Sequence, residues 1–285
     1  MDVASIPRCE IRMVVTDVDG TLLDSDHRVH ARNAAAIREL RDQHPNIPFV
    51  IATGKPFAAT AEIRDDLNLH DQFAIHINGC LVYDQTGAII SDSRLAPKVA
   101  IEIYETNRKS TTATFMYSGD MVYEVVHDAE GIHGKSWLDT LRAYGENVVP
   151  APAGLIEKVA SGEQGVQKML VAVQVAHVEE KRNFLLDTWP DEFHLTQALP
   201  WAIELLPLGA SKAHALTEVL KRAAIPPENV LAFGDGENDA SMLALVTFGV
   251  CMANGMALAK TSARYRTLSN DEGGLGAALE TIFGF

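Results

Sequence analysis

Short apolar segments rich in β-branched residues recur near both ends of the chain. Each one stops at a polar loop, and segments with helical periodicity separate them. Fully buried strands of a parallel sheet have this near-continuous apolar pattern. We therefore predict an α/β fold whose core is a doubly wound, mostly parallel sheet. The predicted strands are residues 11–16, 47–52, 73–77, 230–233 and 248–252, and the predicted helices are residues 31–43, 57–69, 210–223 and 272–283.

The middle third of the chain follows a different pattern. Residues 80–83 and 88–91 flank the turn sequence Asp84-Gln-Thr-Gly87, which predicts a β-hairpin. The strands predicted after it, residues 112–116, 121–126 and 168–175, alternate apolar and polar residues, as expected for an antiparallel sheet with one covered face. We therefore predict that an α+β cap domain, residues 85–203, is inserted into a Rossmann-like core formed by residues 1–84 and 204–285.

The charge balance limits the partners that we expect. Lys and Arg total 24 and Asp and Glu total 38, which gives a formal net charge of −14 at pH 7. Neutralising nucleic-acid phosphates requires clustered Lys and Arg, so we expect no nucleic-acid partner. No apolar run approaches the ~20 residues of a membrane-spanning helix, so we expect no membrane partner. Residues 1–12 also lack the basic-then-apolar order of a signal peptide.

Cysteine usage favours a reducing compartment. The three cysteines, Cys9, Cys80 and Cys251, are far apart in the sequence and form no C-x-x-C pair. Such spacing indicates neither a disulfide framework nor a thiolate zinc site. We expect a cytoplasmic protein that is a monomer or a small homo-oligomer.

Four aspartates follow two of the predicted core strands. Asp17 and Asp19 come after the first strand, and Asp235 and Asp239 come after residues 230–233. Sites in open α/β sheets form at the carboxyl ends of the strands, so we expect these carboxylates to share a small volume. Like charges repel unless a divalent cation neutralises them, and an all-oxygen donor set suits Mg²⁺. The first pair alone would also fit a polar turn, but the second loop favours a metal site.

The order of the polar loops resembles that of the haloacid dehalogenase-like hydrolases. The chain carries Asp17-Val-Asp-Gly-Thr-Leu-Leu, Thr53-Gly54, Lys212 and Gly234-Asp-Gly-Glu-Asn-Asp239 in this order. The large insert after the third core strand is similar to the α/β cap domain of the Cof-type branch. Any one motif would be weak evidence, but the ordered set is specific and spans nearly the whole chain.

The resemblance implies a role for each matching residue. Asp17 would be the nucleophile that forms an aspartyl-phosphate, and Asp19 would protonate the leaving oxygen and then activate water. The ligands of Mg²⁺ would be Asp17, Asp235 and the backbone carbonyl of Asp19. Phosphoryl oxygens would be bound by Thr53, the N–H of Gly54 and Lys212, while Asn238 and Asp239 would hold metal-bound waters or orient Asp17 and Lys212.

Two lysines and two asparagines need separate interpretation. Lys212 lies in the first turn of a predicted helix, where the helix dipole disfavours a cation, so a functional reason for it is favoured. Lys55 follows Thr53-Gly54, where the Cof-type branch usually has Arg, and these two cations are not interchangeable. Asn78 and Asn254 follow predicted strands, and each fits either a site residue or a plain turn.

The resemblance implies a Mg²⁺-dependent phosphatase that hydrolyses a small-molecule phosphomonoester. Phosphosugars are the common substrate class of the family, and pyridoxal phosphate and nucleotides such as FMN stay open. The nearest alternative is a sugar phosphomutase on the same scaffold, which would return the phosphoryl group to the sugar. A non-catalytic sensor of a phosphate ligand is a further hypothesis, and the intact set of acidic and basic motif residues argues against it.

Overall fold

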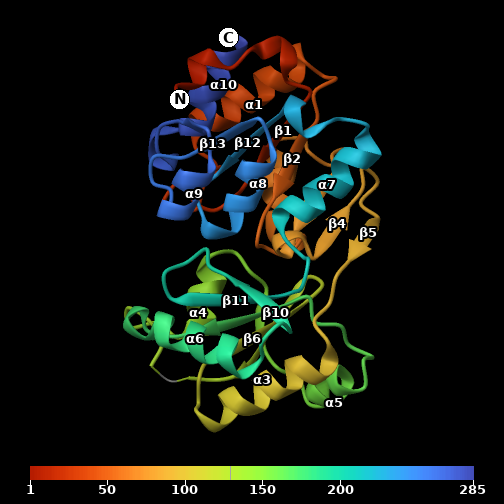
Figure 1. Ribbon diagram of the computed structural model, residues 1–285, viewed down its shortest axis with the longest axis vertical. Helices are drawn as coiled ribbons and strands as arrows, with labels where there is room; N and C mark the ends of the chain where they lie inside the picture. The colour runs from red at the N-terminus through yellow and green to blue at the C-terminus, as the bar shows by residue number, and fades with distance from the viewer. Residues whose placement is uncertain (129) are drawn as a thin grey trace. The chain divides into compact units, whose positions relative to one another are not determined.

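Strand β1 (Met13–Thr16) lies inside an eight-stranded sheet, between β12 (Val230–Gly234) and β2 (Phe49–Ala52) (Figure 1). The computed structural model describes residues 1–128 and 130–285, and in it both of these pairings are parallel. Opposite ends of the chain thus supply neighbouring strands. The sheet order is β14-β13-β12-β1-β2-β3-β4-β5, with β3 (Ala74–His76), β4 (Leu81–Tyr83), β5 (Ile89–Asp92), β13 (Phe248–Cys251) and β14 (Tyr265–Arg266).

Helices cover both faces of this sheet because successive strand residues point to opposite sides. Val14 belongs to the core on one face, and its neighbours Met13 and Val15 belong to the core on the other. The sheet is therefore doubly wound and mostly parallel, as predicted. The first core includes residues of α1 (Ala31–Gln43), α2 (Ala61–Asp66) and α10 (Gly274–Phe283), and the second includes residues of α7 (Lys212–Ala223), α8 (Ala240–Leu245) and α9 (Ala257–Ser262).

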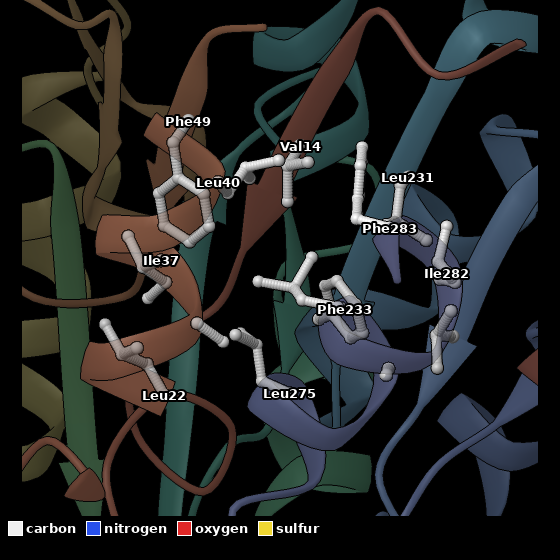
Figure 2. Close-up of a cluster of buried hydrophobic side chains, with 14 of the residues drawn as sticks. Val14, Leu22, Ile37, Leu40, Phe49, Leu231, Phe233, Leu275, Ile282 and Phe283 are labelled. Carbon is white, nitrogen blue, oxygen red and sulfur yellow. The ribbon is translucent and has the colours of Figure 1, made fainter. Parts of the chain in front are cut away.

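The core between α1, α10 and the sheet is shown in Figure 2. Ile37 and Leu40 of α1 and Leu275 of α10 are fully buried, as are Val14 and Phe233 of the sheet. Burying one such side chain stabilises the fold by about 1.5–3 kcal/mol relative to exposing it. This packing holds β1 and β12 in place, and the polar loops described below begin at the carboxyl ends of these two strands.

A second sheet of six strands forms the other unit. Its order is β10-β11-β9-β6-β7-β8, and its pairings are antiparallel except that between β7 and β8, which is parallel. Helices α3, α5 and α6 pack with it around a separate core. The bounds are β6 (Thr114–Ser118), β7 (Met121–Val126), β8 (Val148–Pro150), β9 (Lys168–Ala172), β10 (Phe193–Thr196), β11 (Ala202–Pro207), α3 (Pro97–Lys109), α4 (Trp137–Ala143), α5 (Leu155–Ala160) and α6 (Val178–Thr188).

The boundaries of the two units differ from the expected limits at residues 84 and 204. The first unit comprises residues 1–54, 61–91 and 211–285, and the second comprises residues 55–60 and 92–210. The hairpin after Asp84 returns the chain to the first sheet as β5, so the unit continues beyond it. Strand β11 pairs with β9, so the chain leaves the second unit after β11 and not before it.

Among the described residues, the longest helices are α1 and α3, with 13 residues each. A helix needs ~20 mostly apolar residues to cross a bilayer. Within the part of the chain that the structure describes, no helix is long and apolar enough to do so.

Candidate active site

Asp17 and Asp235 follow directly after the adjacent parallel strands β1 and β12. The N–H of Asp17 donates to the carbonyl oxygen of Phe233 across 3.0 Å, which ties the two strand ends together. One carboxylate oxygen from each of Asp17, Asp235 and Asp239 lies within 4.8 Å of the others. The structure thus places three of the four singled-out aspartates at one edge of the sheet.

Lys212 lies between two of these carboxylates. Its Nζ donates to Oδ1 of Asp17 and to Oδ1 of Asp239, both across 2.6 Å, and its side chain is fully buried. Helix α7 begins at this residue, and the hydroxyl of Ser211 caps the helix by accepting from the N–H of His214. Burial disfavours the charged ammonium, but the charges of Asp17 and Asp239 outweigh it and raise the pKa of Lys212.

Both oxygens of Asp239 are engaged by donors. Oδ1 accepts from Lys212, and Oδ2 accepts from the backbone N–H groups of Asp235 and Gly236, each across 2.9 Å. A Cβ at Gly234 would lie 2.6 Å from the Cβ of Asp239, so this close packing requires glycine. Asp239 therefore fixes the loop that carries Asp235.

Asp235 is held from the other side by the loop that follows β1. The hydroxyl of Thr21 donates to Oδ1 of Asp235 across 2.7 Å. Gly20 adopts φ +74°, and a Cβ there would lie 2.4 Å from Oδ2 of Asp235. Thr21 was not predicted to be a partner of Asp235, because this contact joins residues 214 positions apart. The carboxylate of Asp19 lies outside the three-carboxylate group, but its charge contributes to the electrostatics of Asp235.

The candidate site carries more negative than positive charge, because three carboxylates surround one ammonium. Burial and then the charge of Asp239 raise the pKa of Asp17 well above its ordinary value, although Lys212 opposes the shift. Burial and the charge of Asp239 likewise raise the pKa of Asp235 to about 7. One ammonium does not offset three carboxylates, so a further cation would stabilise their ionised forms.

The donor atoms fit Mg²⁺. Within the described residues, Oδ2 of Asp17 and Oδ2 of Asp235 have no hydrogen-bond partner. In the same part of the chain, the buried Oδ1 of Asn238 has none either. Carboxylate and amide oxygens are ligands, or partners of ligand waters, for a hard divalent cation. Asp17 and Asp235 would hold the ion, and Asn238 would accept from one of its waters.

Thr53 and Gly54 follow β2, the neighbour of β1 on its other side. The N–H of Thr53 donates to the carbonyl oxygen of Ile75, and its own carbonyl accepts from the N–H of Asn78, both across 2.9 Å. A Cβ at Gly54 would lie 3.1 Å from Oδ1 of Asn78, and the same Oδ1 accepts from Nδ2 of Asn238 across 2.9 Å. Asn78 therefore links this loop to the Asp235 loop.

Asn78 and Asn254 both join loops of the site. Asn78 is buried and adopts the left-handed conformation, with φ 55°, that asparagine tolerates better than most residues. Asn254 donates from Nδ2 to the carbonyl oxygen of Gly20 across 2.8 Å, while its Oδ1 accepts from the N–H of Asn270. Both residues bond to residues distant in the sequence, so each does more than close a local turn and links loops around the candidate site.

Comparison with known sequences identifies the family to which this chain belongs. A family model for haloacid dehalogenase-like hydrolases matches residues 14–279. The uncharacterized hydrolases C215.10 and C25B8.12c of Schizosaccharomyces pombe are 36% and 37% identical over 280 residues, covering 96% of this chain and 91% of theirs. YcsE of Bacillus subtilis, a 5-amino-6-(5-phospho-D-ribitylamino)uracil phosphatase, is 26% identical over 272 residues and 95% of each chain.

Solved structures share the fold. A HAD/COF-like hydrolase of Plasmodium vivax superposes with a TM-score of 0.83 at 23% identity, covering 96% of both chains. A haloacid dehalogenase-like hydrolase of Bacteroides thetaiotaomicron superposes with a TM-score of 0.81 at 24% identity, covering 96% of this chain and all of that one. The similarity in each case includes both units of the chain.

Proposed function

Because this chain belongs to the Cof-type branch of the haloacid dehalogenase-like hydrolases, we propose that it is a Mg²⁺-dependent phosphatase of a small phosphomonoester. One observation carries the proposal: the buried ammonium of Lys212 joins Asp17 and Asp239, with the Asp235 carboxylate in the same group. Phosphoryl transfer depends mainly on positioning and on charge stabilisation, and this arrangement supplies both.

The proposed first step is attack by Asp17. One of its carboxylate oxygens forms a bond to phosphorus, while the bond from phosphorus to the leaving oxygen breaks. Asp19 donates its proton to that oxygen, so the alcohol leaves neutral and an aspartyl-phosphate remains on Asp17. Lys212, the hydroxyl of Thr53 and the N–H of Gly54 bind the phosphoryl oxygens. Mg²⁺, when bound, supplies further positive charge against the phosphoryl group.

The second step regenerates the enzyme. Asp19, now ionised, takes a proton from water as the water oxygen bonds to phosphorus. The bond from phosphorus to Asp17 breaks, inorganic phosphate leaves, and both aspartates return to their starting state. Asp239 takes no part in bond changes, since its oxygens are occupied in orienting Lys212 and the Asp235 loop.

We propose a phosphosugar or a related phosphorylated polyol as the substrate. The support comes from YcsE and from YitU, also of Bacillus subtilis and 26% identical to this chain, which are both phosphatases of a phospho-D-ribityl compound. The substrate of those two proteins carries its phosphate on a polyhydroxylated chain. A cap of this size could exclude water and select among leaving groups, which is the proposed role of residues 92–210.

The test is release of inorganic phosphate from a panel of phosphosugars, pyridoxal phosphate, FMN and p-nitrophenyl phosphate. We expect turnover with Mg²⁺ and none with EDTA. Asp17→Asn should abolish turnover, whereas the exposed control Asp26→Asn should not. Full turnover by Asp17→Asn would contradict the assignment of Asp17 as the nucleophile. An isomerised sugar phosphate without free phosphate would instead indicate a phosphomutase, and binding without either product would indicate a sensor.

A further inference from the structure

Lys55 is the residue after Gly54, yet its contacts place it with residues 92–210. Its side chain is almost fully buried, and its Nζ donates to the carbonyl oxygen of Tyr144. Nζ also lies 5.9 Å from the centre of the Tyr144 ring. Tyr144 is the C-cap residue that follows α4, and the last carbonyls at a helix end have no partner within the helix. A cation at this position is favoured by the helix dipole.

The segment that begins at Lys55 has a second attachment to the same unit. The N–H of Ala58 donates to Oδ1 of Asp120 across 2.8 Å. Pro56 lies between the two attachments, and a proline fixes its own φ and restricts the residue before it to extended conformations. Residues 55–58 therefore form a stiff segment that is held at both ends by the second unit.

The residues on the other side of the Gly54–Lys55 peptide are held by the first unit. The carbonyl of Thr53 accepts from the N–H of Asn78, and Gly54 packs against the Asn78 side chain. The Gly54–Lys55 peptide thus joins a segment held by the first unit to a segment held by the second. A displacement of residues 55–58 relative to Thr53 therefore changes the backbone dihedral angles on either side of this peptide.

We propose that Lys55 is a positioning residue that sets the orientation of the Gly54 peptide by holding residues 55–58 on the second unit. The inference rests on the proposed function, in which the N–H of Gly54 binds a phosphoryl oxygen. Lys55 does not touch the phosphate in this mechanism. It acts through the Gly54 peptide, so that the attachment of residues 55–58 by Lys55 and the affinity for phosphate depend on one another.

The test compares Lys55→Met, which keeps most of the length and removes the charge, with Lys55→Arg, which keeps a donor. We expect Lys55→Met to raise both KM for p-nitrophenyl phosphate and the inhibition constant of inorganic phosphate by about tenfold, which is about 1.4 kcal/mol. Lys55→Arg should restore at least half of that loss in free energy. The exposed Lys98→Met on α3 is the matched control and should change neither value.

A second variant tests the other attachment. Asp120→Ala removes the acceptor of the Ala58 N–H, and we expect it to weaken phosphate binding in the same direction but by less. Unchanged KM and phosphate inhibition in Lys55→Met would overturn the inference. So would a loss of thermal stability with unchanged phosphate binding, since that result indicates a purely structural role.

Phosphate binding measured by calorimetry separates this inference from the proposed function. A wild-type protein that binds inorganic phosphate but hydrolyses no ester contradicts the phosphatase. The effect of Lys55→Met on binding then still decides the role of Lys55. A wild-type protein that binds no phosphate contradicts both.

Discussion

The Nζ atom of Lys212 lies 2.6 Å from Oδ1 of Asp17, although 195 positions separate the two residues in the chain. Both side chains are buried, so this contact is formed away from bulk water, where opposite charges interact strongly. The same ammonium also holds Asp239. A single side chain thus fixes the proposed nucleophile and the residue that orients the Asp235 loop.

Lys212→Met should lower kcat by at least ~10²-fold, the loss typical of removing one preorganised charge-stabilising donor. It should also lower the free energy of unfolding by about 3–5 kcal/mol, since two buried carboxylates lose their partner. Turnover of p-nitrophenyl phosphate and urea unfolding measure the two effects. Lys221→Met is the control on the same helix, because that lysine is 67% exposed and pairs with Glu218. Wild-type turnover by Lys212→Met would contradict the role given to Lys212.

Thr21→Val removes the hydroxyl that orients Asp235 while keeping the shape of the side chain. Losing a hydrogen bond to a metal ligand typically weakens metal affinity by ~10–100-fold. We expect the Mg²⁺ concentration for half-maximal turnover to rise by that factor, with most of kcat recovered at saturating Mg²⁺. Thr21→Ser keeps the donor and should behave like the wild type. An identical Mg²⁺ dependence for Thr21→Val and wild type would show that Thr21 does not support a metal ligand.

Asp235→Asn should change the response of thermal stability to Mg²⁺. A ligand that binds only the folded state stabilises it by about 2.7 kcal/mol at a hundred times its Kd, so Mg²⁺ should raise the Tm of the wild type. This rise should vanish in Asp235→Asn. In EDTA at pH 8 the variant should be more stable than the wild type. The substitution replaces one of three crowded carboxylates by an uncharged amide and so reduces their mutual repulsion. Asp26→Asn should keep the Mg²⁺ response.

Glu280→Gln tests the pair that joins α1 to α10. Arg32 donates to both oxygens of Glu280 at 2.6–3.1 Å, and these hydrogen bonds lower the pKa of Glu280 below its ordinary value. A lowered folded-state pKa gives stability that is present above the unfolded pKa of about 4.3 and is lost as the pH falls through the folded value. The pair is more than a third exposed on the Arg32 side, so its contribution should be on the order of 0.5 kcal/mol.

The measurement for this pair is urea unfolding of wild type and Glu280→Gln between pH 3 and 7. We expect the difference in unfolding free energy to be full at pH 6–7 and to shrink below about pH 4. The exposed Glu192→Gln serves as the reference for loss of a carboxylate at the surface. A difference that stays constant across this range would mean that the ion pair does not stabilise the packing of α1 on α10.

The core sheet could be predicted because its central strands are buried on both sides and have nearly continuous apolar sequences. Helix α1 was predicted with its observed bounds, and β1, β2 and β3 were each predicted one to two residues too long. The second unit was harder to predict. Strand β11 was not predicted, because it follows a Pro-containing segment and carries the buried charge of Glu204 in an otherwise apolar run. The predicted domain boundary between residues 203 and 204 therefore fell inside this strand.

The candidate site was predicted to the extent that local motifs define it. Asp17, Lys212 and Asp235 are recognisable because each lies in a short motif at the end of a strand or the start of a helix. Thr21 and Asn78 were not recognised as links between loops, because their partners are fixed by tertiary packing and not by nearby sequence. The membership of residues 55–60 in the second unit was missed for the same reason.

The position of β12 between β1 and β13 has a consequence for synthesis of the protein. The ribosome synthesises β1 early, but it synthesises β12 only after the entire second unit has been made. Until then the pairing of β1 with β12 cannot form, and Asp17 lacks the Asp235 loop beside it. A nascent or prematurely terminated chain that stops before β12 therefore lacks Asp235 and Asp239 of the candidate site, however well its second unit has folded.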